Sequence, residues 1–311
     1  MKPKHVSWYS GQHTEYCERT LVTLLHRMGP WKQAVFLVGG LAPRYLFPNS
    51  AHAGTTDVDL VVSLDLLAET EAYNTLEKNL KEMGFERSVE EGRPIHWRWR
   101  KAITDKITVI VELLCDTEEV GAGKSVRLPE EKQLSALNIK GVNLATEDFI
   151  KVELRAELLD GGGIAPETVR VVGLAAFLVL KARAYGDRGE QKDAYDILYC
   201  LKEETPVEAA RKFQTLRAEA SDPSLFEDAV RVLQQDFATD EQTEGYRKNG
   251  AVSYATFLTD PASSDANANI RRQREAAAVV EAFLEAIAAI ETHVDDNTAL
   301  TSPLPGEEGD A

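Results

Sequence analysis

Two aspartates that stand one residue apart, directly before an apolar run, place the strongest constraint on this chain. The stretch is residues 54–62, GTTDVDLVV, in which Asp57 and Asp59 lead into Leu-Val-Val. On an extended strand, side chains at i and i+2 project from the same face, so the two carboxylates lie side by side. Because close carboxylates repel each other, the pair is costly without a cation between them. Mg²⁺ prefers oxygen ligands and bridges protein carboxylates to phosphates, so the stretch predicts a magnesium site, with Mn²⁺ as the alternative ion.

A pair of glycines lies ahead of these aspartates. Gly39 and Gly40 close an apolar run at residues 35–38. Two adjacent glycines let a backbone approach a phosphate closely. Taken alone, the aspartates could be ordinary solvent-facing acids at the start of a strand. Together with the glycine turn, they indicate metal-dependent transfer from a nucleoside triphosphate.

Length and composition describe an ordinary globular protein. The 311 residues are enough for two domains with separate cores, and 43% hydrophobic with 28% charged residues is a common balance. No apolar run reaches the roughly 20 residues that cross a bilayer. Residues 1–10 lack the apolar core of a signal peptide, so we expect a cytoplasmic protein with no membrane partner. The net charge of −16 argues against broad non-specific nucleic-acid binding but leaves room for a local basic groove.

The order of periodic segments predicts an α+β fold with two domains and a tail. Residues 1–163 form the expected mixed-sheet domain, residues 164–293 the expected helical domain, and residues 294–311 an acidic, disordered tail. The run Asp-Gly-Gly-Gly at 160–163 is the expected hinge or domain boundary. Besides the aspartate strand, the predicted strands are residues 33–38, 94–101, 106–114 and 140–144. The predicted helices are residues 14–28, 41–47, 66–83, 146–159, 173–185, 191–202, 207–218, 223–237 and 267–293.

Further charged residues could complete the site. Glu112 stands in an otherwise apolar strand, where an unpaired charge is expensive. It is either a salt-bridged or edge-facing glutamate, or a third acid that serves as metal ligand or general base. In the helical half, Lys181 and Arg188 share one helical face, as do Asp193 and Asp196. These four could simply form an interhelical salt-bridge network. In the functional interpretation, Lys181 contacts a triphosphate and Asp193 orients or deprotonates an acceptor hydroxyl.

A basic, aromatic segment precedes Glu112. Arg98 and Arg100 alternate with Trp97 and Trp99, which is typical of a strand with two different faces. The alternation favours the tryptophans as core residues and leaves the arginines as candidates for phosphate contact. His52 is interpreted as an ordinary loop residue.

Four short motifs follow one another between about residues 35 and 200. They are Gly39-Gly40-x-x-x-Arg44, Thr55-x-Asp57-x-Asp59, Lys181 with Arg188 seven residues later, and Asp193-x-x-Asp196. In this order they resemble the motifs of the AbiEii/AbiGii-type nucleotidyltransferases, which belong to the DNA-polymerase-β-like superfamily and include toxins of toxin–antitoxin systems. The family's first motif often reads Gly-Ser, and here Gly40 replaces the serine, so backbone amides would contact the phosphate.

The resemblance implies a nucleotidyltransferase domain, a helical domain, and a nucleotide between them. The matching acids, Asp57 and Asp59, are implied to hold Mg²⁺, and Lys181 and Asp193 are implied to be needed for transfer. The expected partners are a nucleoside triphosphate, an acceptor hydroxyl such as a tRNA 3′ end, and a cognate antitoxin protein. The residues expected to bind the nucleotide are Gly39, Gly40, Arg44, Thr55, Arg188 and Asp196.

Our hypothesis from the sequence is therefore Mg²⁺-dependent transfer of a nucleotidyl group. Lys181, with Arg188 or Arg44, would steady the phosphates, and Asp193 or Glu112 would accept the proton of the attacking hydroxyl. Two alternatives stay open. The same fold could modify a small cationic acceptor such as an aminoglycoside, which suits 51 acidic residues against 35 basic ones. The chain could also be a non-catalytic module that binds nucleotide or antitoxin.

Overall fold

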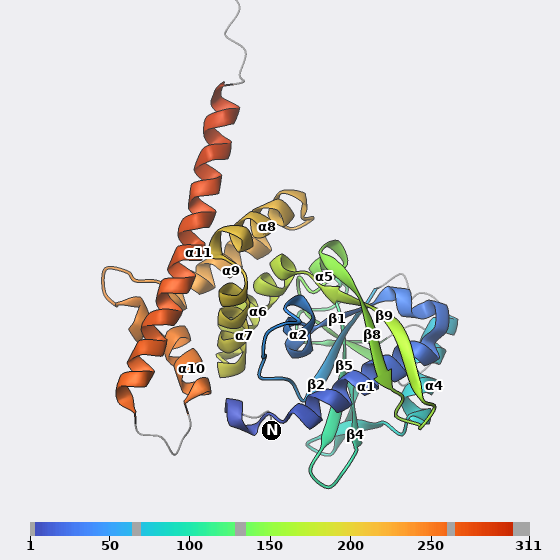
Figure 1. Cartoon of the computed structure of the whole chain (residues 1–311). Coiled ribbons are helices and arrows are strands. Elements are labelled where there is room, and N and C mark those ends of the chain that lie inside the picture. The colour runs from blue at the N-terminus through green and yellow to red at the C-terminus, as the bar shows by residue number, and fades with distance from the viewer. Residues whose placement is uncertain (1–3, 64–69, 128–134, 260–264, 301–311) are drawn as a thin grey trace, which may run out of the picture.

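A nine-stranded mixed sheet forms one half of the molecule and a group of helices forms the other (Figure 1). The computed structural model describes residues 4–63, 70–127, 135–259 and 265–300. The strands are β1 Val35–Val38, β2 Asp57–Val62, β3 Glu86–Glu90, β4 Arg93–Ala102, β5 Thr108–Cys115, β6 Ser125–Arg127, β7 Ser135–Asn138, β8 Phe149–Glu157 and β9 Ile164–Val172. The predicted α+β fold class, with a sheet followed by helices, is confirmed.

The aspartate strand lies at the centre of this sheet. The strand order is β3-β4-β5-β2-β1-β9-β8, with β7 beside β5 and β6 beside β7. β2 runs antiparallel to β1 and parallel to β5. Leu60, Val61 and Val62 are buried, as expected for a central strand covered on both faces. The acids at the beginning of β2 therefore stand on a rigid element.

The sheet half carries its own helices. These are α1 Gly11–Met28, α2 Pro43–Leu46, α4 Thr70–Glu82 and α5 Leu144–Glu147, with 3₁₀ turns η1 Val6–Trp8, η2 Gly29–Ala34 and η3 Gly39–Leu41. α1 lies across β9, β8, β5 and β2 and packs against α4. Ser10 caps α1 by accepting a hydrogen bond from the His13 amide, and the helix buries its apolar stripe in the core.

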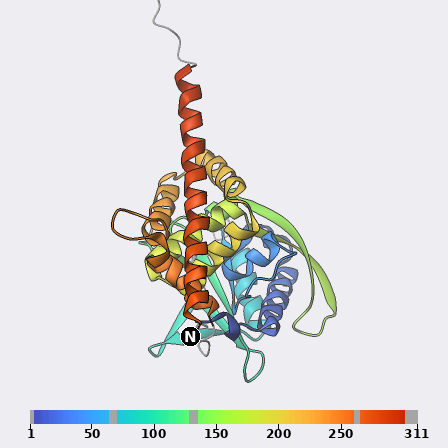
Figure 2. The ribbon, with the colours of Figure 1, turned by 60° about the vertical axis from the view of Figure 1, so that its left-hand side comes forward.

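The helical half follows β9 without interruption. Its elements are α6 Leu174–Arg188, α7 Gln191–Glu203, α8 Pro206–Glu219, α9 Ser224–Phe237, η4 Gly245–Arg247, α10 Asn249–Leu258 and α11 Ala266–Leu300. α6 packs against α7, α8 and α9, and α7 also contacts α2 of the sheet half. The long helix α11 packs along α8 and α10, and its C-terminal end projects from the body in both views (Figures 1 and 2). Among the described residues, no helix is long and apolar enough to cross a membrane.

Several sequence predictions about the second half of the sheet are wrong. Residues 146–159 do not form a helix: most of them belong to β8, on which Val152, Leu154 and Ala156 alternate with exposed charged residues. Residues 140–143 form a turn rather than a strand, Leu144 begins α5, and the last short strand before β8 is β7. The glycine run at 160–163 is the turn of the β8–β9 hairpin rather than a hinge, and β9 pairs with β1. The division into two domains stays a prediction, and the element order favours a boundary at Gly173.

Other predicted boundaries differ in smaller ways. The helix expected at 267–293 extends to Leu300 as α11, into the region expected to be a disordered tail. Residues 301–311 of that tail lie outside the described residues, as do residues 64–69 of the helix expected at 66–83. The helix α10 and the strands β3, β6, β7 and β9 were not predicted.

Candidate active site

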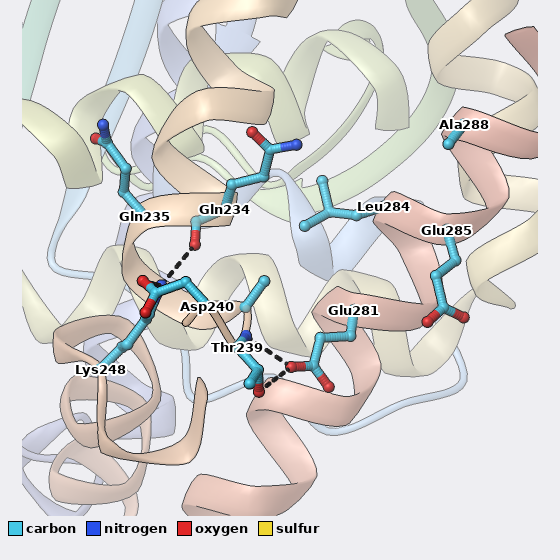
Figure 3. Close-up of a pocket in the computed structure, with 10 residues that line it drawn as sticks. Gln234, Gln235, Thr239, Asp240, Lys248, Glu281, Leu284, Glu285 and Ala288 are labelled. Atoms are coloured by element: carbon cyan, nitrogen blue, oxygen red, sulfur yellow. Dashed lines mark hydrogen bonds and ion pairs between the residues drawn. The ribbon is translucent and has the colours of Figure 1, made fainter. Parts of the chain in front are cut away.

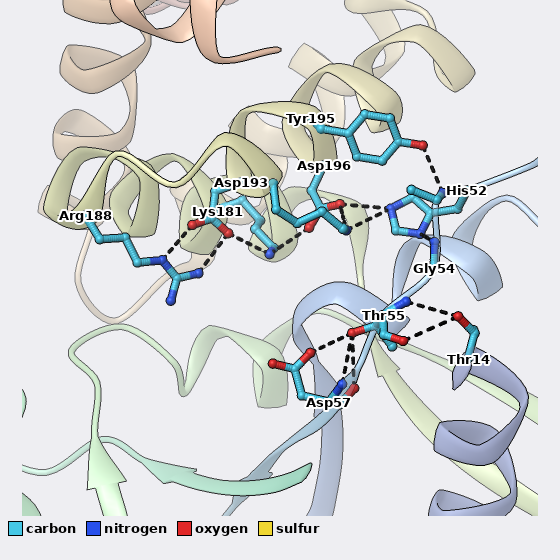
Figure 4. A network of polar contacts seen from close by, with 12 residues as sticks. Thr14, His52, Gly54, Thr55, Asp57, Lys181, Arg188, Asp193, Tyr195 and Asp196 are labelled. Carbon is cyan, nitrogen blue, oxygen red and sulfur yellow. Dashed lines mark hydrogen bonds and ion pairs between the residues drawn. The ribbon is translucent and has the colours of Figure 1, made fainter. Parts of the chain in front are cut away.

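A cavity of about 510 Å³ lies where the sheet half meets the helical half. Its lining includes ten of the eleven residues that the sequence singled out: Gly39, Gly40, Thr55, Asp57, Asp59, Glu112, Lys181, Arg188, Asp193 and Asp196. The acids of β2 and β5 form one wall, and α6 with the start of α7 forms the other. Figure 4 shows the two polar clusters facing each other, with Asp57 at the start of β2 and Thr55 just before it below Lys181, Asp193 and Arg188.

The acid wall consists of three carboxylates. Because β2 and β5 run parallel with Asp59 opposite Glu112, the third acid stands directly beside the second. Asp57, Asp59 and Glu112 each offer a carboxylate oxygen, and these atoms all lie within 4.8 Å of one another. Asp57 is only 5% exposed, and its Oδ1 accepts a hydrogen bond of 2.7 Å from the Thr55 hydroxyl. The predicted third acid is therefore brought to the pair by strand register.

The glycine turn makes room for this wall. Gly39 has a φ of +69°, and a Cβ at this position would lie 1.8 Å from Oδ2 of Asp59. No other residue type fits that position without moving the Asp59 carboxylate. A Cβ at Gly40 would meet the Thr55 hydroxyl at 3.0 Å and the Lys192 amine at 3.7 Å. The Thr55 hydroxyl thus fills the space beside Gly40.

The facing wall is a network of buried ion pairs between α6 and α7. Lys181 Nζ lies 2.8 Å from Oδ1 of Asp193 and 2.8 Å from Oδ2 of Asp196. Arg188 donates to both oxygens of Asp193, at 2.7 and 2.9 Å. The interhelical salt-bridge network that the sequence left open is therefore present. It also lines the cavity, so the network and a ligand contact do not exclude each other.

Burial and pairing shift the pKa values of this network. Burial alone would raise the pKa of Asp193, but Lys181 and Arg188 outweigh it, so the pKa of Asp193 is lowered. Burial alone would lower the pKa of Arg188, but Asp193 and then Asp59 outweigh it and the pKa is raised. The field of the acid wall thus reaches the cations of the helical wall. Because its pKa is lowered, Asp193 is a weak proton acceptor.

Two more residues join this network: the sequence analysis did not single out Lys192, and it interpreted His52 as an ordinary loop residue. Lys192, at the start of α7, lines the cavity and forms an ion pair with Asp196. His52 donates from Nε2 to Oδ1 of Asp196 at 2.8 Å, because its Nδ1 accepts the Gly54 amide hydrogen at 3.2 Å. Burial, followed by the charge of Lys192, lowers the pKa of His52 to about 4. Lys192 was detectable from the sequence, because it stands four residues before Asp196 on one predicted helix, whereas nothing near His52 pointed to Asp196.

Some predicted contacts lie elsewhere. Arg44 does not line the cavity: its Nε bonds to Glu18 Oε1 at 3.1 Å, and its side chain is 49% exposed. Arg98, a candidate for phosphate contact, instead forms an ion pair with Glu112. Trp99 is a core residue as predicted, at 1% exposure.

A second cavity lies away from the acids. It has a volume of about 700 Å³ and is bordered by α9, the segment that leads to α10, and α11 (Figure 3). Its polar groups bond mainly to one another. Lys248 pairs with Asp240 at 2.6 Å, and Glu281 accepts from the amide and hydroxyl of Thr239 at 2.8 and 2.7 Å. We therefore treat the first cavity as the candidate site.

The residues of the acid wall fit a divalent cation. Three carboxylates from adjacent strands supply the hard oxygen ligands that Mg²⁺ or Mn²⁺ prefers. Gly39 keeps the space beside Asp59 free of a side chain. Asp57, Asp59 and Glu112 are therefore the residues that could hold the ion.

Comparisons with known proteins add a weak structural similarity. No protein-family model matches the chain, and no curated protein matches it in sequence. Among solved structures, that of the antibiotic-resistance factor ANT(2'')-Ia matches with a TM-score of 0.33 and 17% identity, and covers 64% of this chain and 90% of that chain. A similarity of this size carries no conclusion about activity. The resemblance to the AbiEii/AbiGii-type nucleotidyltransferases stays a prediction.

Proposed function

We propose that the protein is a metal-dependent nucleotidyltransferase, which moves a nucleoside monophosphate from a nucleoside triphosphate to an acceptor hydroxyl. One observation supports this most directly: a single cavity has three clustered carboxylates on one wall and Lys181, Arg188 and Lys192 on the wall that faces it. A triphosphate needs a cation site for its oxygens and further positive charge around it. Both requirements meet in this cavity.

Each part of the site has a role in this proposal. Asp57, Asp59 and Glu112 would hold the divalent cation, which would supply positive charge at the phosphate oxygens. The backbone of Gly39 and Gly40 lets the triphosphate approach the sheet closely. Thr55 keeps Asp57 oriented through its hydroxyl. Among the residues that the sequence proposed for the nucleotide, Arg44 has no role here because its side chain is directed to Glu18.

The helical wall steadies the phosphates. Lys181 and Arg188 present their charges toward the cavity while Asp193 and Asp196 keep them in place. Asp193 is therefore a positioning residue rather than the base. Glu112, which stands in the acid wall beside Asp59, is the other candidate for the base that the sequence named.

The chemical step breaks one bond and forms another. The acceptor oxygen attacks the α-phosphorus, and the new P–O bond forms as the bond to the bridging oxygen breaks. Pyrophosphate leaves with the bonding electrons, and the acceptor's proton passes to Glu112. A tRNA 3′ end and an aminoglycoside hydroxyl are the two acceptors to compare. A toxin-like role with an antitoxin partner is supported only by the motif resemblance.

Incubation of the purified protein with each α-labelled nucleoside triphosphate, Mg²⁺ and either total tRNA or an aminoglycoside tests this function. We expect label on one acceptor class and loss of transfer in Asp57→Asn. Asp160→Asn makes the same chemical change at the exposed turn of the β8–β9 hairpin, and we expect it to keep full transfer. No label on RNA, aminoglycoside or protein, together with no triphosphate binding, would overturn the proposal.

A further inference from the structure

Glu112 stands between the acid pair and an arginine. On one side, β5 places it opposite Asp59 of β2. On the other side, β4 places Arg98 opposite it, with Arg98 Nε 3.1 Å from Glu112 Oε1. The Glu112 side chain is 14% exposed and that of Arg98 is 28% exposed, so water screens the pair only in part. Arg98 is thus a permanent cation in direct contact with the carboxylate cluster.

The cluster needs positive charge when no metal ion is bound. Three carboxylates with oxygens within 4.8 Å repel one another strongly. Arginine stays protonated at every working pH, so its charge at Glu112 offsets part of this repulsion. A divalent cation that used Glu112 as a ligand would compete with the guanidinium for the same carboxylate.

We propose that Arg98 is a counter-charge of the metal-free site and that it weakens divalent-metal binding by competing for Glu112. This inference rests on the proposed function, since it concerns the same metal site. Arg98 is a positioning residue: it acts through Glu112 and sets how readily the third carboxylate is given up to the metal. The three carboxylates therefore bind a metal ion only when their attraction to the ion exceeds the attraction between Glu112 and Arg98.

Mn²⁺ titration followed by electron paramagnetic resonance, without nucleotide, tests this inference on the full chain. We expect Arg98→Met to bind Mn²⁺ about tenfold more tightly than the unaltered protein, because a unit positive charge beside the ion is removed. We expect Arg98→Lys, which keeps the charge, to stay within about threefold of the unaltered protein. The metal-free Arg98→Met protein should also melt at a lower temperature, and Mn²⁺ should restore most of the loss.

Arg100 provides a matched control. It lies two residues further along β4 and pairs with Glu86 of β3 instead of the acid cluster, at 2.9 Å. Arg100→Met makes the same change in total charge, and we expect it to alter Mn²⁺ affinity less than twofold. In a Glu112→Gln background, Arg98→Met should lose most of its effect, because the residue through which it acts is no longer charged.

The outcomes separate this inference from the function on which it rests. Unchanged or weaker Mn²⁺ binding in Arg98→Met would overturn the competition, even if the unaltered protein binds Mn²⁺ and transfers nucleotides. An equal gain in Arg100→Met would also overturn it, because the effect would then be one of overall charge. Failure of the unaltered protein to bind Mn²⁺ would refute the metal site itself, and both proposals with it.

Discussion

Replacing Gly39 with alanine tests the geometry of the acid wall directly. A Cβ at this position would lie 1.8 Å from Oδ2 and 2.7 Å from Cγ of Asp59, whereas ordinary contacts begin at 3.4 Å. The carboxylate must therefore retreat by about 1.6 Å. Mg²⁺ and Mn²⁺ accept ligand oxygens only near their bonding distance, about 2.1 Å for Mg²⁺, so Asp59 would be lost as a ligand. The φ of +69° adds about 1–2 kcal/mol of backbone strain for any L-residue with a side chain.

We expect Gly39→Ala to weaken Mn²⁺ binding at least tenfold in an equilibrium titration and to lower the melting temperature by several degrees. Gly40→Ala is the matched control, because it adds the same methyl group to the adjacent residue. Its φ is not positive, and its closest neighbour is the Thr55 hydroxyl at 3.0 Å, which can give slightly. We expect less than a threefold change in Mn²⁺ affinity there. Unaltered binding in Gly39→Ala, or an equal loss in Gly40→Ala, would refute the reasoning.

Three further predictions concern the structure around the site. The pKa of His52 is about 4 in the folded protein, below its ordinary value of 6.5. Between these two pH values the unfolded chain binds more protons than the folded chain. The free energy of unfolding therefore falls as the pH drops through this range. Urea denaturation at pH 7 and pH 5 should show about 2 kcal/mol more acid loss in the unaltered protein than in His52→Gln, and equal losses would contradict the shift. Asp193→Asn leaves Lys181 and Arg188 without their shared carboxylate and should cost about 3 kcal/mol in denaturant unfolding, where a loss below 1 kcal/mol would argue against the network. Asp148 Oδ2 accepts a hydrogen bond of 2.9 Å from the amide of Ala176, in the first turn of α6. Asp148→Ala should therefore lower the free energy of unfolding by about 1 kcal/mol in denaturant unfolding, while Mn²⁺ affinity stays constant. A changed affinity would show that this contact also shapes the site.

Local patterns were sufficient for many of the elements. The alternation of acids followed by β-branched residues predicted β2 because such a run is stable only as a covered strand. Helices α6 to α9 of the second half were predicted because apolar residues at helical spacing recur in each of them. The acid pair and the glycine turn were also visible, since both consist of residues close together in the sequence.

The segment around β8 shows where local patterns failed. Residues 146–159 begin with Thr-Glu-Asp, which resembles a helix start, and the prediction gave this more weight than the period-two alternation of Val152, Leu154 and Ala156. Only the short helix α5 forms near this start. The strand wins because β9 offers it a full ladder of partners, from Phe149 opposite Val172 to Glu157 opposite Ile164. Pairing with the next strand of the hairpin overrides a local helix signal.

The sequence by itself determined which residue types were available for the site: two adjacent acids, a glycine pair, and cations and acids on two consecutive helices. Only the tertiary structure decided which of them meet. Strand register placed Glu112 beside Asp59 and gave it Arg98 as a partner, the loop before β2 brought His52 to Asp196 of α7, and Arg44 was directed to Glu18 instead. The physical reason is that side-chain spacing along one element follows from backbone geometry, whereas contacts between elements depend on which surfaces bury the most apolar area together.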